Sequence, residues 1–268
     1  GTGEIDTAFP VGGGMYYSEE NGTAQEVEKT ITVVENSVEF DTKTWYESEQ
    51  NGIVWHYKLD GNGDIIGLYT ESNIDPIIDI TGTLNIPARV AGRTVIAIGD
   101  GTEGDHHSVI PATSVGVSQW KSLSLPTTVK TINDYAFFQT QADADITIPA
   151  TVTKVGAKAF YDSQVKSVNI NRMSGTVGSL AFGDCSNLSN ITITGGQEGL
   201  EISTMAFQGA SATSVTVSGK TTLNKQSFEN CASLNDLTIT GSVSIGEYAF
   251  NGCTSLPKVY MPAGRSEE

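Results

Sequence analysis

The pair Ala-Phe, replaced once by Ser-Phe, recurs through the second half of the chain at a nearly constant spacing. The aromatic residues are Phe137, Phe160, Phe182, Phe207, Phe228 and Phe250, which are separated by 23, 22, 25, 21 and 22 residues. A period in this range marks a protein built from repeat units. One such unit cannot bury its own apolar residues, so neighbouring units must stack and share a continuous core. The spacing therefore predicts a solenoid.

Each unit also carries a short apolar-x-apolar segment, often followed by Pro. In a strand, this alternation turns the first and third residues inward and the middle residue outward. Stacking would pair these strands in parallel, with one strand for each unit. We expect strands at Leu84–Ile86, Leu123–Leu125, Ile146–Ile148, Val168–Ile170, Ile191–Ile193, Val215–Val217, Leu237–Ile239 and Val259–Met261.

Further columns of residues keep the register of the repeat. Four positions before the small residue of each pair stands a branched apolar residue, followed by Gly, Asn or Ser. These three residue types suit a tight corner, either through positive φ or by capping a helical turn. Cys185, Cys231 and Cys253 stand three positions after a Phe. An odd count without a C-x-x-C pair argues against a disulfide framework, so we expect a buried column of thiols. Trp120 falls in another apolar column and should lie in the core.

The unit at residues 243–262, VSIGEYAFNGCTSLPKVYMP, resembles the repeat of the BspA-like leucine-rich-repeat family. The resemblance extends over about residues 84–262. It implies an α/β leucine-rich-repeat solenoid with short parallel strands, mostly strand and turn with short helical turns. It also implies a bacterial surface or secreted protein of the adhesion type that is not an enzyme. The first unit departs from the pattern, because no Ala-Phe follows Ile98-Gly99 and an insertion occupies about residues 100–120.

The acidic residues gather in the first part of the chain. Residues 1–79 hold 16 acidic and 3 basic side chains, whereas residues 80–268 hold 15 and 12. This difference indicates parts of different character. We expect an acidic segment in which short strands can form at 1–50, a β-hairpin cap at 51–80, the solenoid at 81–262 and a tail at 263–268.

The segment Asp60-Gly61-Asn62-Gly63 lies between two runs of strand-forming residues and is a strong hairpin signal. This hairpin would cover one open end of the solenoid, as a cap does in repeat proteins. The apolar bulk of the cap would come from Trp45, Trp55, Tyr57 and Tyr69.

The same turn carries oxygen ligands at calcium-loop spacing. Asp60, Asn62, Asp64 and Glu71 stand at positions 1, 3, 5 and 12 of an EF-hand loop, but position 6 is Ile65 rather than Gly. Both flanks also read as strand rather than helix. We therefore favour the hairpin and predict neither a metal nor a cofactor.

The insertion holds two acidic residues near a pair of histidines, which could ligate zinc. Its candidate ligands are Asp100, Glu103, Asp105, His106 and His107. A solvated surface turn explains the same residues more simply, so we predict no zinc site here.

Partner binding is the function that the remaining features favour. A net charge of −16 argues against nucleic acid and anionic lipid. Catalytic motifs are absent. The middle residues of the strands, among them Thr192 and Thr216, would form an uncharged polar face with few of the side chains that dominate interfaces. We therefore expect a tight partner to bind at the irregular parts, which are the insertion with His106 and His107, the N-terminal cap and the C-terminal edge near Tyr260. Thr192 and Thr216 are the candidates if the strands instead form a weak, extended hydrogen-bonding surface for protein or glycan.

The expected partner is a host matrix protein or a bacterial surface protein. The alternative is a glycan-binding surface component that uses the N-terminal aromatic residues. No apolar stretch is long enough to span a membrane. The chain begins with Gly1, and we expect that a leader has been removed. The expected location is outside the cell or on the surface of a bacterium. Membrane contact would come only through such an N-terminal signal or anchor, including a lipid anchor.

Overall fold

The computed structural model describes residues 16–20, 23–27, 42–71, 75–79, 81–101, 108–110 and 120–257. The chain divides into two compact units, Gly1–Glu39 and Phe40–Glu268. In the first unit, β1 (Tyr16–Glu20) and β2 (Thr23–Val27) form an antiparallel pair. The second unit contains all the other elements.

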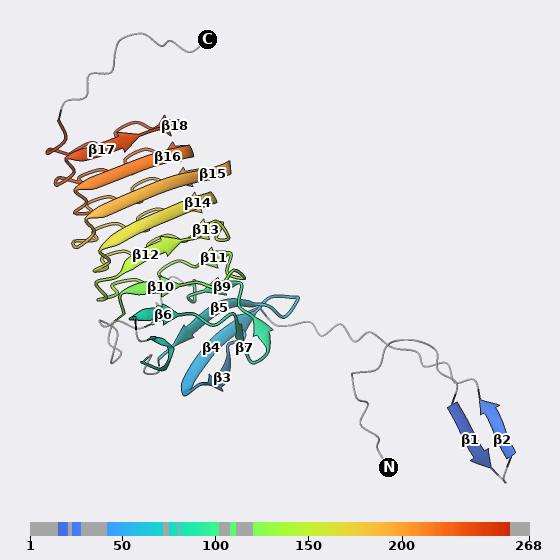
Figure 1. Ribbon diagram of the computed structural model, residues 1–268. Coiled ribbons are helices and arrows are strands. Elements are labelled where there is room, and N and C mark those ends of the chain that lie inside the picture. The colour runs from blue at the N-terminus through green and yellow to red at the C-terminus, as the bar shows by residue number, and fades with distance from the viewer. Residues whose placement is uncertain are drawn as a thin grey trace, which may run out of the picture. The chain divides into compact units, whose positions relative to one another are not determined.

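The second unit is a parallel solenoid whose strands stack as successive rungs (Figure 1). The first ladder runs in the order β17-β16-β15-β14-β12-β10-β6, which confirms the expected parallel stacking. Its strands are β6 (Thr83–Asn85), β10 (Ser122–Ser124), β12 (Asp145–Ile148), β14 (Ser167–Val177), β15 (Asn190–Ile202), β16 (Ser214–Leu223) and β17 (Asp236–Ile239). The eighth expected strand, Val259–Met261, lies outside the described residues.

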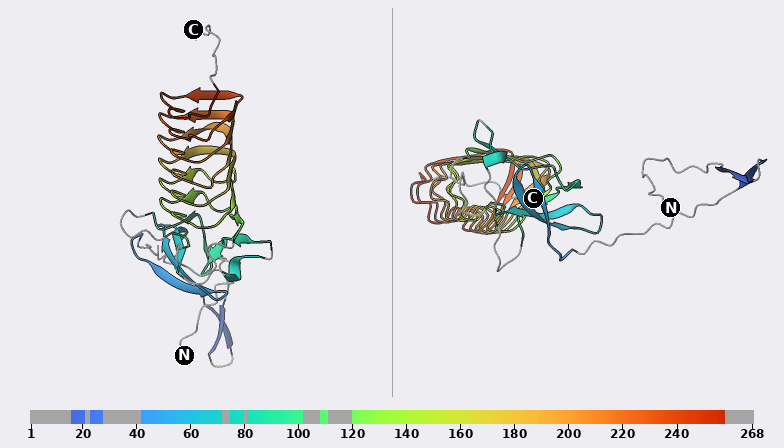
Figure 2. Two further views of the ribbon diagram at one scale, coloured as in Figure 1. Left: turned by 90° about the vertical axis from the view of Figure 1, so that its left-hand side faces the viewer. Right: turned by 90° about the horizontal axis from the view of Figure 1, so that it is seen from below.

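A second parallel ladder corrects the expectation of one strand for each unit. It pairs β9 with β11, β11 with β13 and β13 with the end of β14, and it continues through the ends of β15 and β16 to β18. The added strands are β9 (Ala97–Ile98), β11 (Thr131–Ile132), β13 (Lys154–Val155) and β18 (Ser242–Ile245). The two ladders lie on different sides of each coil (Figure 2). The branched apolar column before the corner, which includes Ile132 and Val155, is therefore the inward column of a strand.

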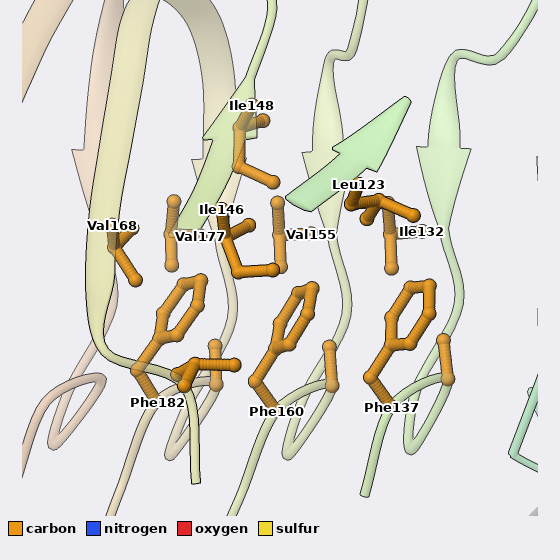
Figure 3. Close-up of a cluster of buried hydrophobic side chains, with 14 of the residues drawn as sticks. Leu123, Ile132, Phe137, Ile146, Ile148, Val155, Phe160, Val168, Val177 and Phe182 are labelled. Atoms are coloured by element: carbon orange, nitrogen blue, oxygen red, sulfur yellow. The ribbon is translucent and has the colours of Figure 1, made fainter. Parts of the chain in front are cut away.

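The recurring Phe side chains form a continuous stack through the core (Figure 3). From Phe137 to Phe228, neighbouring ring centroids lie 4.8–5.1 Å apart with interplanar angles of 1–11°. Each of these rings is fully buried. Trp120 is also fully buried, as expected, and packs 6.2 Å from Phe137.

The turn around each Ala-Phe pair consists of overlapping i→i+3 turns rather than an α-helix. In one unit, the backbone N–H of Ala181 donates to Gly178 O at 3.2 Å and that of Gly183 donates to Leu180 O at 3.0 Å. The described residues contain one 3₁₀ helix, η1 (Asp75–Ile77), and no α-helix. These turns are the short helical turns that the sequence predicts.

Two residues in every such turn have left-handed backbone. They lie four positions apart, as at Leu180 (φ 54°) and Asp184 (φ 53°). The column of Asp184 consists mostly of Asp, Asn and Gly, which tolerate positive φ. The column of Leu180 contains none of these three residue types. The Gly/Asn/Ser column was expected either to cap a helical turn or to adopt positive φ. There it occurs at Gly99, whereas Gly156, Gly178 and Gly246 are needed because a Cβ would collide with the backbone of the preceding rung.

The column of thiols is buried, as expected. Cys185 Sγ donates to Phe160 O at 3.1 Å, Cys231 Sγ to Phe207 O at 3.2 Å and Cys253 Sγ to Phe228 O at 3.2 Å. Each thiol therefore satisfies a carbonyl of the preceding rung, and all three cysteines are free. Burial raises the pKa of Cys185 to about 11.

An antiparallel sheet covers the N-terminal end of the solenoid (Figure 1). It contains β3 (Tyr46–Gln50), β4 (Ile53–Leu59) and β5 (Ile65–Thr70), with the expected hairpin between β4 and β5. Single bridges join β5 to the first rung, from Ile65 to Val95 and from Leu68 to Gly99. A short hairpin of β7 (Arg89–Val90) and β8 (Arg93–Thr94) follows β6.

Candidate functional site

The outward side chains of the first ladder form a polar surface, which we call the strand face. It contains Asp145, Ser167, Asn190, Ser214, Asp236, Thr147, Asn169, Thr192, Thr216 and Thr238. Thr192 is exposed, Thr216 is half-buried, and the two are paired in register on β15 and β16. Ser167 donates to Asp145 at 2.5 Å and Ser214 to Asp236 at 3.2 Å. Part of the hydrogen-bonding capacity of this face is therefore used within the protein.

A group of aromatic side chains lies on the outer side of the turns in the second and third units. We call Tyr135, Phe138, Lys158 and Tyr161 the turn-edge cluster; all four are half-buried. Phe138 lies 6.0 Å from Tyr161 in a stacked pair and 5.6 Å from Tyr135 in an edge contact. Lys158 Nζ lies 5.6 Å and 5.7 Å from the two tyrosine rings.

Hydrogen bonding fixes the position of Tyr161 in this cluster. Its hydroxyl donates to Asp184 Oδ2 at 2.5 Å, which raises the pKa of Tyr161 to about 12. The turn-edge cluster was not predicted from the sequence, because the periodic signal there is the buried Phe column. The signal was present in the aromatic residues directly after Phe137 and Phe160.

The insertion joins the solenoid at the same turn. Ser108 Oγ donates to Ala136 O at 2.8 Å, and the N–H of Val109 donates to the same carbonyl at 2.7 Å. Phe137 makes the equivalent bond to Ala159 in the next unit. Ser108-Val109 therefore takes the place of the Ala-Phe pair that the sequence analysis regarded as missing, and Val109 is fully buried.

The start of the insertion is also fixed against the second unit. A Cβ on Gly101 would lie 3.3 Å from Asn133 Cβ, so the residues that flank segment 102–107 of the insertion, Gly101 and Ser108, both border the turn that carries Tyr135 and Phe138. The candidates His106 and His107 lie outside the described residues, as does Tyr260.

The aromatic residues of the cap are mostly part of its core. Trp55 is 1% exposed, and Tyr57 and Tyr69 are each 8% exposed. Burial, together with the charges of Glu71, Asp100 and Glu47, raises the pKa of Tyr69. Trp45 is half-buried, with Lys58 Nζ 4.4 Å from its ring and Tyr69 packed edge-on at 5.0 Å. Among the four aromatic residues of the cap, Trp45, Trp55, Tyr57 and Tyr69, Trp45 is thus the least buried.

The turn with calcium-loop spacing is closed by its own side chain. Asp60 Oδ1 accepts hydrogen bonds from the backbone N–H groups of Asn62 and Asp64, each at 2.9 Å. This arrangement is the hairpin turn that the sequence analysis favoured. Within the described parts of the chain, no group of three or more His, Cys, Asp and Glu residues could hold a metal ion. None of the helices described there is long and apolar enough to cross a membrane.

The repeat architecture matches one family of proteins. The model of the BspA type leucine rich repeat region matches six copies, over residues 110–222 and 197–267, which together make up more than half of the chain. The chain belongs to this family. Repeat solenoids of this kind present extended surfaces to other molecules, and the BspA-type chain is in general terms a protein-interaction module. The sequence has no significant match among curated proteins.

Two solved structures have the same fold. The leucine-rich-repeat protein of T. pallidum is 20% identical, with a TM-score of 0.51 over 75% of this chain and 87% of its own. A leucine-rich-repeat protein from Eubacterium ventriosum is also 20% identical, with a TM-score of 0.52 over 79% of this chain. The match spans 53% of the length of the E. ventriosum protein. At this level of identity, the likeness concerns the fold alone.

Proposed function

We propose that this BspA-type chain is a non-enzymatic adhesion module of a bacterial surface or secreted protein, and that it binds a protein partner through its turn edge. The observation that carries the proposal is the turn-edge cluster beside the two ends of the insertion. Tyrosine is enriched among the residues that dominate protein interfaces. In this cluster the Phe138 ring lies 5.6 Å and 6.0 Å from the two tyrosine rings, and Lys158 Nζ lies 5.6 Å and 5.7 Å from the same two rings.

The strand face fits this role less well. Its two columns contain two carboxylates and otherwise Ser, Thr and Asn, and two of these hydroxyls, those of Ser167 and Ser214, already donate to neighbouring rungs. Small polar side chains seldom contribute large binding energies. The proposal therefore places His106 and His107 with the turn-edge cluster in one binding region, and it places Thr192 and Thr216 outside that region.

The test is a binding screen of the purified chain against immobilised extracellular-matrix proteins and bacterial surface proteins. Phe138→Ala, Tyr161→Ala and replacement of residues 102–107 by a Gly/Ser linker should each weaken a saturable hit. The expected loss is at least about tenfold in Kd, or about 1.4 kcal/mol. Thr192→Glu and Thr216→Glu serve as matched controls and should bind like the wild type. Binding lost in these two strand-face variants and kept in the turn-edge variants would refute the proposal.

The same screen includes a glycan array to test the glycan alternative. Trp45 is the tryptophan to vary there, because it is half-buried whereas Trp55 and Trp120 are buried. Glycan binding that disappears in Trp45→Ala, without any protein hit, would replace the proposed function by the glycan alternative.

A further inference from the structure

Two of the three cysteines occupy equivalent positions on adjacent rungs. Cys231 and Cys253 each stand three residues after a stacked Phe, and the rungs around them are joined by backbone hydrogen bonds from Phe228 to Ala249 and from Asn230 to Asn251 at 2.8 and 2.7 Å. We propose that a peroxide converts Cys231 and Cys253 into a disulfide that links the last two described rungs, whereas Cys185 stays reduced.

The spacing of the rungs favours this pair. Adjacent parallel strands lie about 4.8 Å apart, and a disulfide joins residues whose Cα atoms are about 4.4–6.8 Å apart. Cys253 Sγ points toward the rung of Cys231, because its thiol donates to Phe228 O at 3.2 Å. Cys231 Sγ donates to Phe207 O at 3.2 Å and would turn from that carbonyl toward Cys253 to form the bond. Cys185 is separated from Cys231 by the rung that carries Ala210, which puts it at about twice the rung spacing and out of reach.

The solvent exposure of the three thiols also favours reaction at Cys253 rather than at Cys185. Cys253 is 8% exposed, whereas Cys185 and Cys231 are fully buried. Cys253 belongs to the last described rung, where Ile245 is 47% exposed although its equivalents in earlier rungs are buried. A small oxidant can therefore reach Cys253 when this rung opens, while the interior rungs stay closed.

The acidities of the thiols assign the reacting roles. The neighbouring thiol of Cys231 lowers the pKa of Cys253, and the same contact together with burial raises the pKa of Cys231. Since the thiolate is the nucleophile, Cys253 reacts first. Burial raises the pKa of Cys185 to about 11, so this thiol stays protonated and is a poor nucleophile.

The chemistry needs one peroxide for each disulfide. The Cys253 thiolate attacks one oxygen of hydrogen peroxide, the O–O bond breaks, and hydroxide leaves to give a sulfenic acid. Cys231 Sγ then attacks Cys253 Sγ; the S–S bond forms, the S–O bond breaks, and the leaving hydroxide takes the thiol proton to become water. Two thiols lose two electrons in all, and hydrogen peroxide is reduced to two molecules of water.

The product would link the last two described rungs covalently. Cys231 and Cys253 are 22 residues apart, so the bond closes one repeat unit into a loop. A crosslink of this size restricts the unfolded chain and should raise the Tm of the oxidised protein. The bond would form in an oxidising compartment and would be absent from the freshly reduced chain.

Peptide mapping of the full chain tests the proposal. Trypsin places both Cys231 and Cys253 in the peptide 226–258, and Cys185 in the peptide 173–220. After mild hydrogen peroxide treatment and alkylation, peptide 226–258 should lack two alkyl groups and be lighter by two hydrogen atoms. Peptide 173–220 should carry its alkyl group in full, so two of the three thiols disappear.

Matched variants separate this outcome from general oxidation. Cys185→Ala should form the crosslink as the wild type does, and Cys253→Ala should keep Cys231 reduced at the same dose. The proposal is overturned if peptide 226–258 stays reduced at doses that oxidise the urea-unfolded chain. It is also overturned if Cys185 is consumed as fast as Cys253, or if the crosslinks form between chains.

Discussion

Replacing Phe182 by Leu tests whether ring stacking, rather than burial alone, stabilises the solenoid. Phe182 is fully buried and stacks on Phe160 at 4.9 Å and on Phe207 at 5.1 Å, with interplanar angles of 6° in both pairs. An aromatic pair contributes about 0.5–1.5 kcal/mol beyond the area it buries. Phe182→Leu keeps most of the apolar area but loses two pairs, so it should cost about 1–3 kcal/mol. Phe182→Ala also leaves a cavity and should cost about 3–5 kcal/mol.

Phe250 provides the matched control, because it stands at the end of the same column. It is half-buried and has one stacking partner in the described residues, Phe228 at 5.3 Å. Phe250→Leu should therefore cost about 0.5–1.5 kcal/mol, roughly half the effect at Phe182. Urea unfolding measures both free energies, with far-UV circular dichroism and tryptophan fluorescence as independent probes of whether the transition is two-state. Equal losses at Phe182 and Phe250 would refute the stacking argument.

Three further predictions concern the turns and the thiol column. Gln139 is exposed and left-handed (φ 53°), so Gln139→Gly should raise the free energy of unfolding by about 0.5–1 kcal/mol in urea melts. A loss of stability would contradict this. A Cβ on Gly178 would lie 2.7 Å from the backbone nitrogen of Ala157, so Gly178→Ala should lower the unfolding free energy by about 1–3 kcal/mol. Wild-type stability of this variant would show that the two neighbouring rungs can move apart. Burial raises the pKa of Cys185 from 9.0 to about 11, so the folded state keeps the thiol protonated where the unfolded chain ionises. The contribution is therefore complete below pH 9 and is lost as the pH rises toward 11, at a cost of about 2–3 kcal/mol. Cys185→Ala should remove this part of the alkaline decline in pH-dependent urea melts, and identical profiles would contradict it.

The repeat, the first ladder and the cap hairpin could be predicted because each depends on residues that recur or on a strong local signal. The Phe column and the apolar-x-apolar segments have fixed spacing, and Asp60-Gly61-Asn62-Gly63 carries its own turn chemistry. Burial then follows from alternation alone. Inward Ile146 and Ile148 are buried while Thr147 between them is exposed.

The second ladder escaped prediction because its strands are too short to show alternation. At β11 and β13, two residues each pair across the rungs, as Ile132 does with Val155. A single inward residue followed by a corner looks like part of the turn. The pairing depends on the neighbouring rung, and only the stacked structure shows it.

The left-handed positions escaped prediction for a related reason. At Leu180 and Tyr135, the residue type disfavours positive φ, and yet the turn requires it. Stacking of each turn on the next over-determines this backbone. The N–H groups of Tyr135 and Phe137 donate to Ala157 O and Ala159 O of the following unit, and that of Phe182 donates to Ala206 O. The tertiary context thus overrides the local preference, which no reading of single residues would indicate.

The first unit shows how an insertion can be added to a solenoid without opening its core. Val109 fills the Phe position and Ser108 bonds to the next rung, so the rung closes although residues 102–107 are inserted before it. Loops carry function best when the scaffold fixes both of their ends. Replacement of residues 102–107 should therefore leave the unfolding free energy unchanged while it weakens partner binding. If the same replacement destabilised the chain as much as a core substitution does, the insertion would be part of the cap, and the loss of binding would report on folding rather than on contact.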